Sequence, residues 1–202
     1  MKRILLIFAH PAPRRSRINR RLLAAVRGME GVTVHDLYEE YPDFYINVER
    51  EQALLTEHDV VLFQHPFYWY STPALVKQWE DLVLEHGFAY GEKGRALEGK
   101  LWLQAITTGG TKDAYCSQGY NRFSVRQLLA PMEQTAHLCR MTFLPPFVVH
   151  GTFELQEEEL DQQAHHYRQV LEHLQSDSFQ LRRTLAQETL NELVPLRTTA
   201  AA

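Results

Sequence analysis

The stretch LWLQAITTGG, residues 101–110, begins as an apolar run and ends in two threonines and two glycines. An apolar run with little polar alternation is typical of a parallel strand that is covered on both faces. Four other short runs are rich in β-branched or aromatic residues: ILLIFAH (4–10), VTVHDL (32–37), DVVLFQH (59–65) and MTFLPPFVV (141–149). The sequence therefore predicts five strands.

Helical patterns lie between these runs. The segment 16–29 spaces Ile18 and Leu22 at a helical interval, and Ser16 stands where an N-cap is expected. Three further segments have a helical pattern: 74–86, 125–138 and 159–174. In the first of them the residues expected on the buried face are Leu75, Val76, Trp79, Leu82 and Val83. Pro131 is expected to kink or break the second.

Strands that alternate with helices indicate an α/β domain of three layers with right-handed crossovers. We expect this domain to cover residues 1–175. Residues 176–202 are expected to form a C-terminal helical appendage, with one amphipathic helix that stops near Pro195 and a frayed TTAAA end.

Composition and charge exclude several classes of protein. The chain has 202 residues, of which 45% are hydrophobic, and its net charge of −4 disfavours a nucleic-acid-binding protein. Cys116 and Cys139 do not make a disulfide framework, and the histidines have no metal-ligand spacing, so a reducing compartment and no metal site are expected. The apolar run Ile4–Ala9 is too short for a signal peptide or a membrane helix. We expect a cytoplasmic protein.

The loop after the first strand has the features of an anion site. HPAPRRSRIN (10–19) leads into a predicted helix, whose N-terminal N–H groups suit a phosphate. Ser16 and Asn19 can add side-chain donors, and five arginines lie within residues 14–21. The alternative is a solvated helix start whose arginines face water. The loop is neither a GxGxxG nor a Walker sequence.

The loops after the third and fourth strands also stand at the expected ligand edge of the sheet. Phe67, Tyr68, Trp69 and Tyr70 are consecutive, so some of them should be exposed, either to wall a planar ring or to form a dimer interface. Small residues end the fourth strand, either to let the backbone approach a ligand or simply to make a turn: Thr107, Thr108, Gly109 and Gly110.

With these loops the chain resembles the NAD(P)H:quinone oxidoreductases of the DT-diaphorase type. The resemblance covers about Lys2 to Leu174 and is carried by AHP and SRIN, by HPFYWYSTPALVKQWED, by GFAYG and by TTGG with a following tyrosine. Within that family the chain most resembles the ancillary subunits of glutathione-regulated potassium-efflux systems, through DLYEEYPDFYINVEREQALL (36–55) and QHPFYWYSTPAL (64–75). The resemblance implies a flavodoxin-like three-layer sandwich with a five-stranded parallel sheet in the order 2-1-3-4-5.

The resemblance also implies a cofactor, a donor and partners. The cofactor would be FMN, with FAD as the alternative, and NAD(P)H would be the electron donor for quinone reduction. Residues expected to hold the phosphate and ribityl chain are His10, Ser16, Arg17, Ile18 and Asn19. Phe67 to Tyr70 and Thr107 to Gly110 would hold the ring. In a homodimer, Tyr90 of GFAYG would cap the quinone pocket of the partner chain.

One position departs from the family pattern. In the diaphorases a tyrosine after TTGG is followed six residues later by a histidine, and the pair relays charge during hydride transfer. Here the tyrosine is Tyr115, but the histidine position is Asn121, which takes up no proton near neutral pH. Tyr115 is therefore expected either to donate a hydrogen bond to the reduced ring or only to pack the loop.

Two functions follow from this resemblance. The first is a flavin-dependent two-electron quinone reductase that serves as ancillary subunit of a potassium-efflux antiporter. The alternative is a non-catalytic or weakly catalytic regulatory subunit that binds and activates the antiporter. Such a partner would place the protein on the cytoplasmic face of the inner membrane.

Overall fold

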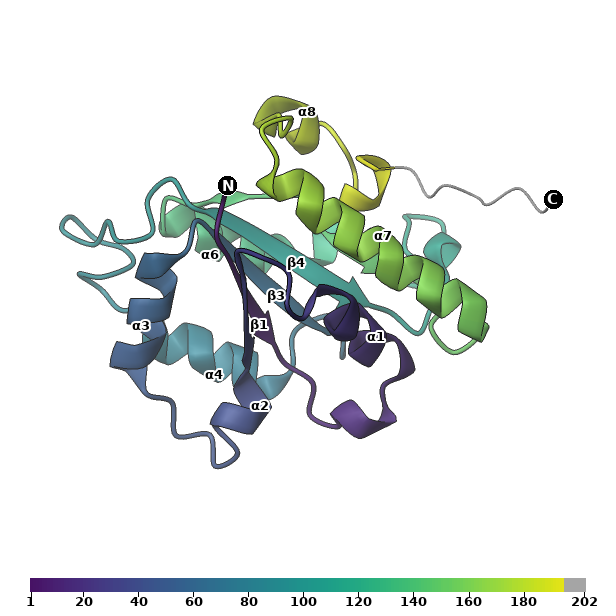
Figure 1. Ribbon diagram of the computed structural model, residues 1–202, viewed down its shortest axis with the longest axis horizontal. Helices are drawn as coiled ribbons and strands as arrows, with labels where there is room; N and C mark the ends of the chain where they lie inside the picture. Colours follow the sequence, from purple (N-terminus) through teal and green to yellow (C-terminus); the bar gives the residue numbers. More distant parts are fainter. Residues whose placement is uncertain (195–202) are drawn as a thin grey trace.

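Six parallel strands form the sheet of the protein, in a computed structural model that describes residues 1–194 (Figure 1). The strands are β1 (Ile4–Phe8), β2 (Val32–Asp36), β3 (Val60–Pro66), β4 (Leu101–Thr107), β5 (Thr142–Phe143) and β6 (Phe147–Val149). Their order is β2-β1-β3-β4-β5, and β6 also pairs with β4. This confirms the flavodoxin-like α/β fold and the strand order 2-1-3-4-5.

The fifth predicted strand is divided in two. Thr142 pairs with Leu101 and Phe147 pairs with Ala105, so β5 and β6 lie one after the other along the same side of β4. Pro145 and Pro146 separate them. Because proline has no N–H to donate, the ladder cannot run on through this pair. The expectation of one continuous strand over 141–149 was wrong.

Helices cover both faces of the sheet (Figure 1). They are α1 (Arg17–Val26), α2 (Leu37–Glu40), α3 (Val48–Glu57), α4 (Ala74–Val83), α5 (Val125–Leu128), α6 (Ala130–Leu138), α7 (Glu157–Gln175) and α8 (Leu181–Leu185). α1 and α7 pack on one face, and α3, α4 and α6 pack on the other. Within the described residues, no helix combines the length and the apolar character needed to cross a bilayer.

Local sequence signals explain where several helices begin and end. The Ser16 hydroxyl accepts a hydrogen bond from the Asn19 N–H at 3.1 Å, which confirms the predicted N-cap of α1. Pro131 lies in the first turn of α6, and the helical pattern breaks between Leu128 and Ala130 as predicted. In α4 the buried arc includes Glu80, whereas Leu82 is 41% exposed. The expectation that Leu82 lies on the buried face was therefore wrong.

A buried carboxylate fixes α3, a helix that was not predicted. Glu51 is fully buried and accepts hydrogen bonds from the Tyr41 hydroxyl at 2.5 Å and the Trp79 indole N–H at 2.7 Å. Its carboxylate also lies 2.9 Å from Nε2 of His35. Burial raises the pKa of Glu51, but these hydrogen bonds outweigh it and leave the pKa below its usual range. The network joins α3 to β2 and α4.

The C-terminal segment differs from the single amphipathic helix that was expected. Up to residue 194 this segment contains the short α8 and a 3-10 turn at Leu190–Glu192. Leu190 is buried and its N–H donates to the Pro146 carbonyl at 2.9 Å, and Asn191 hydrogen-bonds both backbone groups of Val148. These contacts tie the segment to β6. The predicted stop at Pro195 and the TTAAA end lie outside the described residues, and the boundary at residue 175 stays a prediction.

Candidate cofactor and active site

The carboxyl ends of β1, β3 and β4 open into a cleft of about 560 Å³. It is lined by most of the residues predicted to bind a cofactor: His10, Ser16, Arg17, Ile18, Asn19, Phe67, Tyr68, Trp69, Thr107 and Gly109. Tyr70, Thr108 and Gly110 do not line the cleft but lie in the adjoining turns. The fold thus brings the three predicted loops together at one edge of the sheet.

Asn19 joins the first loop to the third. Its side chain is buried, and Nδ2 donates to the Thr107 hydroxyl at 2.9 Å. Its Oδ1 is also buried and has no hydrogen-bond partner among residues 1–194. A buried acceptor without a donor is costly, so this oxygen is available to a hydroxyl of a bound molecule.

His10 presents a donor to the same cleft. Its Nδ1 accepts a hydrogen bond from the Ala12 N–H at 3.1 Å, and burial lowers its pKa. The neutral ring therefore carries its proton on Nε2, which has no hydrogen-bond partner among residues 1–194 and can donate to a bound molecule. α1 begins at Arg17, so the N–H groups of its first turn also stand at the wall of the cleft.

The aromatic loop turns outward after one buried residue. Phe67 is buried, whereas Trp69 is 93% exposed and Tyr68 and Tyr70 are partly exposed. Trp69 and Tyr70 have φ values of 51° and 62°, a left-handed conformation that is strained for bulky side chains. The Tyr70 hydroxyl donates to Oδ1 of Asn121 at 3.1 Å, which links the second loop to the third.

The two glycines after β4 are needed for space and not for a turn. Neither has a positive φ. A Cβ added to Gly109 would lie 2.5 Å from Cε2 of Phe153, and one added to Gly110 would lie 3.2 Å from Cε2 of Tyr115. The close approach seen here is made by side chains of the same chain, and the approach of a ligand to this backbone stays a prediction. The group that approaches Gly109 is Phe153, which was not among the predicted site residues.

His150 is the second residue that the sequence reasoning missed. The Thr108 hydroxyl donates to the Gly110 carbonyl at 2.8 Å, so it accepts from Nδ1 of His150, which lies 3.0 Å away. The rings of His150 and Tyr115 are 5.5 Å apart. Burial first, and then the positive charge of Lys112, lower the pKa of His150 to about 4. His150 is therefore neutral near pH 7.

Tyr115 is available as a hydrogen-bond donor. Burial raises the pKa of its phenol, so the hydroxyl stays protonated at neutral pH. Its ring lies 6.4 Å from that of Phe67, beside the wall of the cleft. Asn121 is held by Tyr70, and its amide stands close to Gly110. The imidazole beside Tyr115 is therefore that of His150, which lies elsewhere in the sequence than the family's histidine position, here Asn121.

Tyr90 lies apart from this cleft within the chain. It lines a separate pocket between α4 and α6, together with Glu80 and Cys139. Its ring packs edge-on against His86, with the ring centroids 5.5 Å apart. The role of Tyr90 as a cap on a partner chain stays a prediction.

The comparison with known proteins identifies the family. A family model described as the flavodoxin-like fold matches residues 2–173. The chain belongs to this family. It is 50% identical over 169 residues to the glutathione-regulated potassium-efflux system ancillary protein KefG of Pectobacterium carotovorum subsp. carotovorum (strain PC1), a match that covers 84% of this chain and 92% of that protein.

Solved structures of this family have the same fold. The general stress protein 14 of Treponema denticola, solved in complex with FMN, has a TM-score of 0.82 and 39% identity, over 86% of this chain and 99% of that one. An NADPH-quinone reductase from P. pentosaceus has a TM-score of 0.75 and 35% identity, over 83% of this chain and 96% of that one. The resemblance to quinone reductases and to potassium-efflux ancillary proteins is confirmed.

Proposed function

We propose that the protein binds FMN and uses NAD(P)H to reduce quinones or similar electrophiles by two electrons, as an ancillary subunit of a potassium-efflux antiporter. The observation that carries this proposal is the cleft in which the ends of β1, β3 and β4 meet. Ligands of open parallel sheets bind at this edge. The FMN-bound relative and the quinone reductase relative support the choice of ligand and of reaction.

The residues of the cleft fit a flavin mononucleotide. The start of α1, the Nε2 proton of His10 and the guanidinium group of Arg15 suit a phosphate. Arg17 lines the same cleft, but its guanidinium group pairs with Glu157. The unpartnered Oδ1 of Asn19 suits a ribityl hydroxyl. When bound, the flavin supplies the two-electron chemistry, and the protein supplies position and electrostatics.

The other loops would hold the ring and place hydrogen-bond donors beside it. Phe67, Tyr68, Trp69 and Phe153 offer aromatic walls, and the ring of Phe153 lies in the space that the missing side chain of Gly109 leaves. The phenol of Tyr115 would donate a hydrogen bond to the flavin ring, on which negative charge develops during reduction. His150 holds the Thr108 hydroxyl and, being neutral, adds no positive charge to the loop.

Two identical copies would complete the substrate pocket, with Tyr90 of one copy covering the cleft of the other. The protein would then work on the cytoplasmic face of the inner membrane, next to the antiporter. The 50% identity to a potassium-efflux ancillary protein supports this partner. It supports equally the alternative of a regulatory subunit with little or no catalysis, which the replacement of the family histidine by Asn121 also favours.

Identification of the released cofactor tests the binding half of the proposal. The purified protein is heated, and the supernatant is separated by chromatography beside FMN and FAD standards. We expect FMN at close to one molecule per chain. Protein that contains no flavin and takes up none from an FMN solution would contradict the proposal. Release of FAD instead of FMN would show that the cofactor is the alternative, FAD.

A further inference from the structure

The first 29 residues hold a concentration of positive charge of which the cofactor cleft explains only a part. They contain eight lysines and arginines and no acidic residue. All 25 acidic residues lie in residues 30–202, together with 13 of the 21 basic ones. The first segment therefore carries a charge of +8, and the remainder of the chain carries −12.

Only part of this charge is neutralised within the fold. Arg17 and Arg21 pair with Glu157 at the start of α7, and Arg21 also lies 3.0 Å from Asp161. Within residues 1–29, five arginine side chains form no ion pair with a carboxylate of the described residues: Arg3, Arg14, Arg15, Arg20 and Arg27. Charges this close together that lack a counter-ion are typical of a surface that meets an anionic partner.

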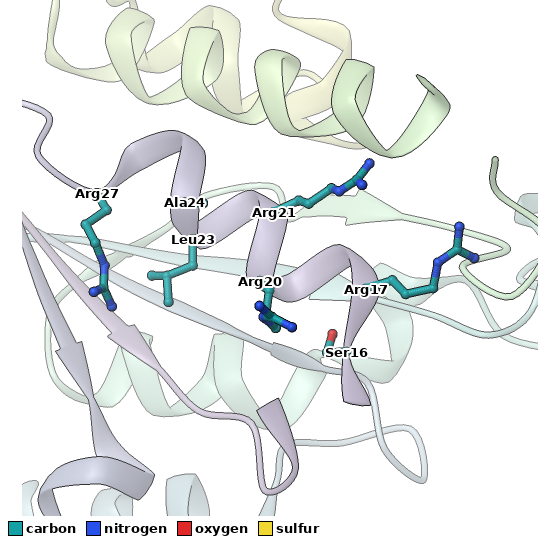
Figure 2. Close-up of a pocket in the computed structure, with 7 residues that line it drawn as sticks. All are labelled: Ser16, Arg17, Arg20, Arg21, Leu23, Ala24 and Arg27. Carbon is teal, nitrogen blue, oxygen red and sulfur yellow. The ribbon is translucent and has the colours of Figure 1, made fainter. Parts of the chain in front are cut away.

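Two of these arginines border a groove on α1. Figure 2 shows Arg20, Leu23 and Arg27 projecting from the same side of the helix, whereas Arg21 extends toward α7. The groove has a volume of about 520 Å³, and Leu23 and Ala24 contribute its apolar part. Residues seven apart on a helix are about 10 Å apart along its axis. Arg20 in α1 and Arg27, the C-cap of this helix, therefore flank Leu23 and Ala24 with one guanidinium group on each side.

This groove is separate from the cofactor cleft. The two share Ser16 and Arg17, but Arg20 and Arg27 line only the groove. The cofactor phosphate would use the start of α1, which lies at the other end of the helix from Arg27. Arg20 and Arg27 are exposed, so their substitution leaves the core and the cofactor cleft intact.

We infer that this face of α1 is a docking surface for an acidic segment of a protein partner. The inference rests on the proposed function and specifies the chemistry by which the antiporter would be recognised. Guanidinium groups bind carboxylates with two parallel hydrogen bonds, and the apolar strip accommodates an aliphatic side chain between them. A long polyanion such as nucleic acid is disfavoured, because the remainder of the molecule carries −12.

The test measures binding of the flavin-loaded protein to the purified cytoplasmic region of the antiporter. The variant is Arg20→Glu with Arg27→Glu, and the matched control is Arg182→Glu with Arg183→Glu on the exposed face of α8, which changes the charge equally. We expect affinity to fall more than tenfold in the first variant and less than twofold in the control. Wild-type affinity should decrease as NaCl rises. Arg20→Gln with Arg27→Gln serves if the double glutamate variant does not fold.

Each other outcome is decisive. Equal affinity of wild type and the Arg20/Arg27 variants would overturn the docking surface and leave the proposed partner in place. Wild-type protein that does not bind the antiporter region would overturn both. Binding to vesicles of phosphatidylglycerol and phosphatidylethanolamine that is lost in the Arg20/Arg27 variants, without binding to the antiporter region, would assign the surface to the membrane and overturn the inference.

Discussion

Among single residues, Tyr115 could be predicted from a sequence motif, whereas His150 could not. The motif after β4 marks Tyr115 from the sequence, and it marks Asn121 as the place where a histidine is missing. It gives no sign of His150, which follows β6 and reaches Thr108 only in the fold. A signal did exist, because His10, His65 and His150 each lie at the end of an apolar run.

Replacement of Tyr115 tests whether its phenol does more than pack the loop. A donor in a fully preorganised site is worth about 10²–10³ in rate, and the partly exposed Tyr115 should contribute less. We expect Tyr115→Phe to slow flavin reduction by NAD(P)H roughly tenfold, with flavin affinity unchanged. Tyr120→Phe, in the same loop but 91% exposed, is the control.

Stopped-flow measurement at several pH values separates the roles of Tyr115 and His150. Because the pKa of His150 is lowered to about 4, its protonation does not change near neutral pH, and the rate should show no inflection from it there. His150→Gln should leave the shape of that pH profile unchanged. An equal rate in Tyr115→Phe would make Tyr115 a packing residue. An inflection near neutral pH that disappears in His150→Gln would contradict a permanently neutral His150.

At the scale of elements, strongly periodic segments could be predicted and irregular ones could not. The strands β1, β3 and β4 are buried along their whole length and consist mostly of apolar residues, and α1 has a clear apolar face. In contrast, α3 buries only Glu51 and Leu55, so its sequence reads as a polar surface. Its position depends on donors from β2 and α4, which are distant in the sequence.

The contact of α4 with α6 contains a second buried carboxyl group, with a measurable consequence. Glu80 is 9% exposed, and its Oε1 has no hydrogen-bond partner within residues 1–194. Burial raises the pKa of Glu80 from 4.5 to about 7. The folded protein therefore holds this proton more tightly than the unfolded chain does, and the resulting stability is lost as pH rises from 4.5 to 7.

Glu80→Gln should remove this pH dependence. At about 1.4 kcal/mol per pKa unit, we expect the variant to exceed wild type in free energy of unfolding by up to about 3 kcal/mol at pH 8, and by little near pH 4. Urea denaturation at both pH values measures this, with the exposed Glu92→Gln as control. A difference that does not change with pH would show that Glu80 titrates normally.

At the scale of the whole molecule, the edge of the sheet that holds the site could be predicted, but not every loop that forms it. Three loops were expected there because the carboxyl ends of parallel strands share one edge. The loop with His150 and Phe153 was missed although the predicted run 141–149 ends at Val149, as β6 does. Only the fold shows that Phe153 lines the cleft and that His150 reaches Thr108. The sequence shows that residues 1–29 are positively charged and that the remainder is negatively charged. The structure was needed to show that the arginines lie along α1, beside α7.

Anaerobic reduction of the bound cofactor shows whether this chain is a reductase. The flavin-loaded protein is mixed with one equivalent of NADPH or NADH, the visible flavin absorbance is followed, and a small quinone is then added. We expect the absorbance to bleach and to return in full when one equivalent of quinone is added, which accounts for two electrons. A fully occupied flavin that neither donor bleaches would contradict the reductase and leave the regulatory subunit as the function of this chain.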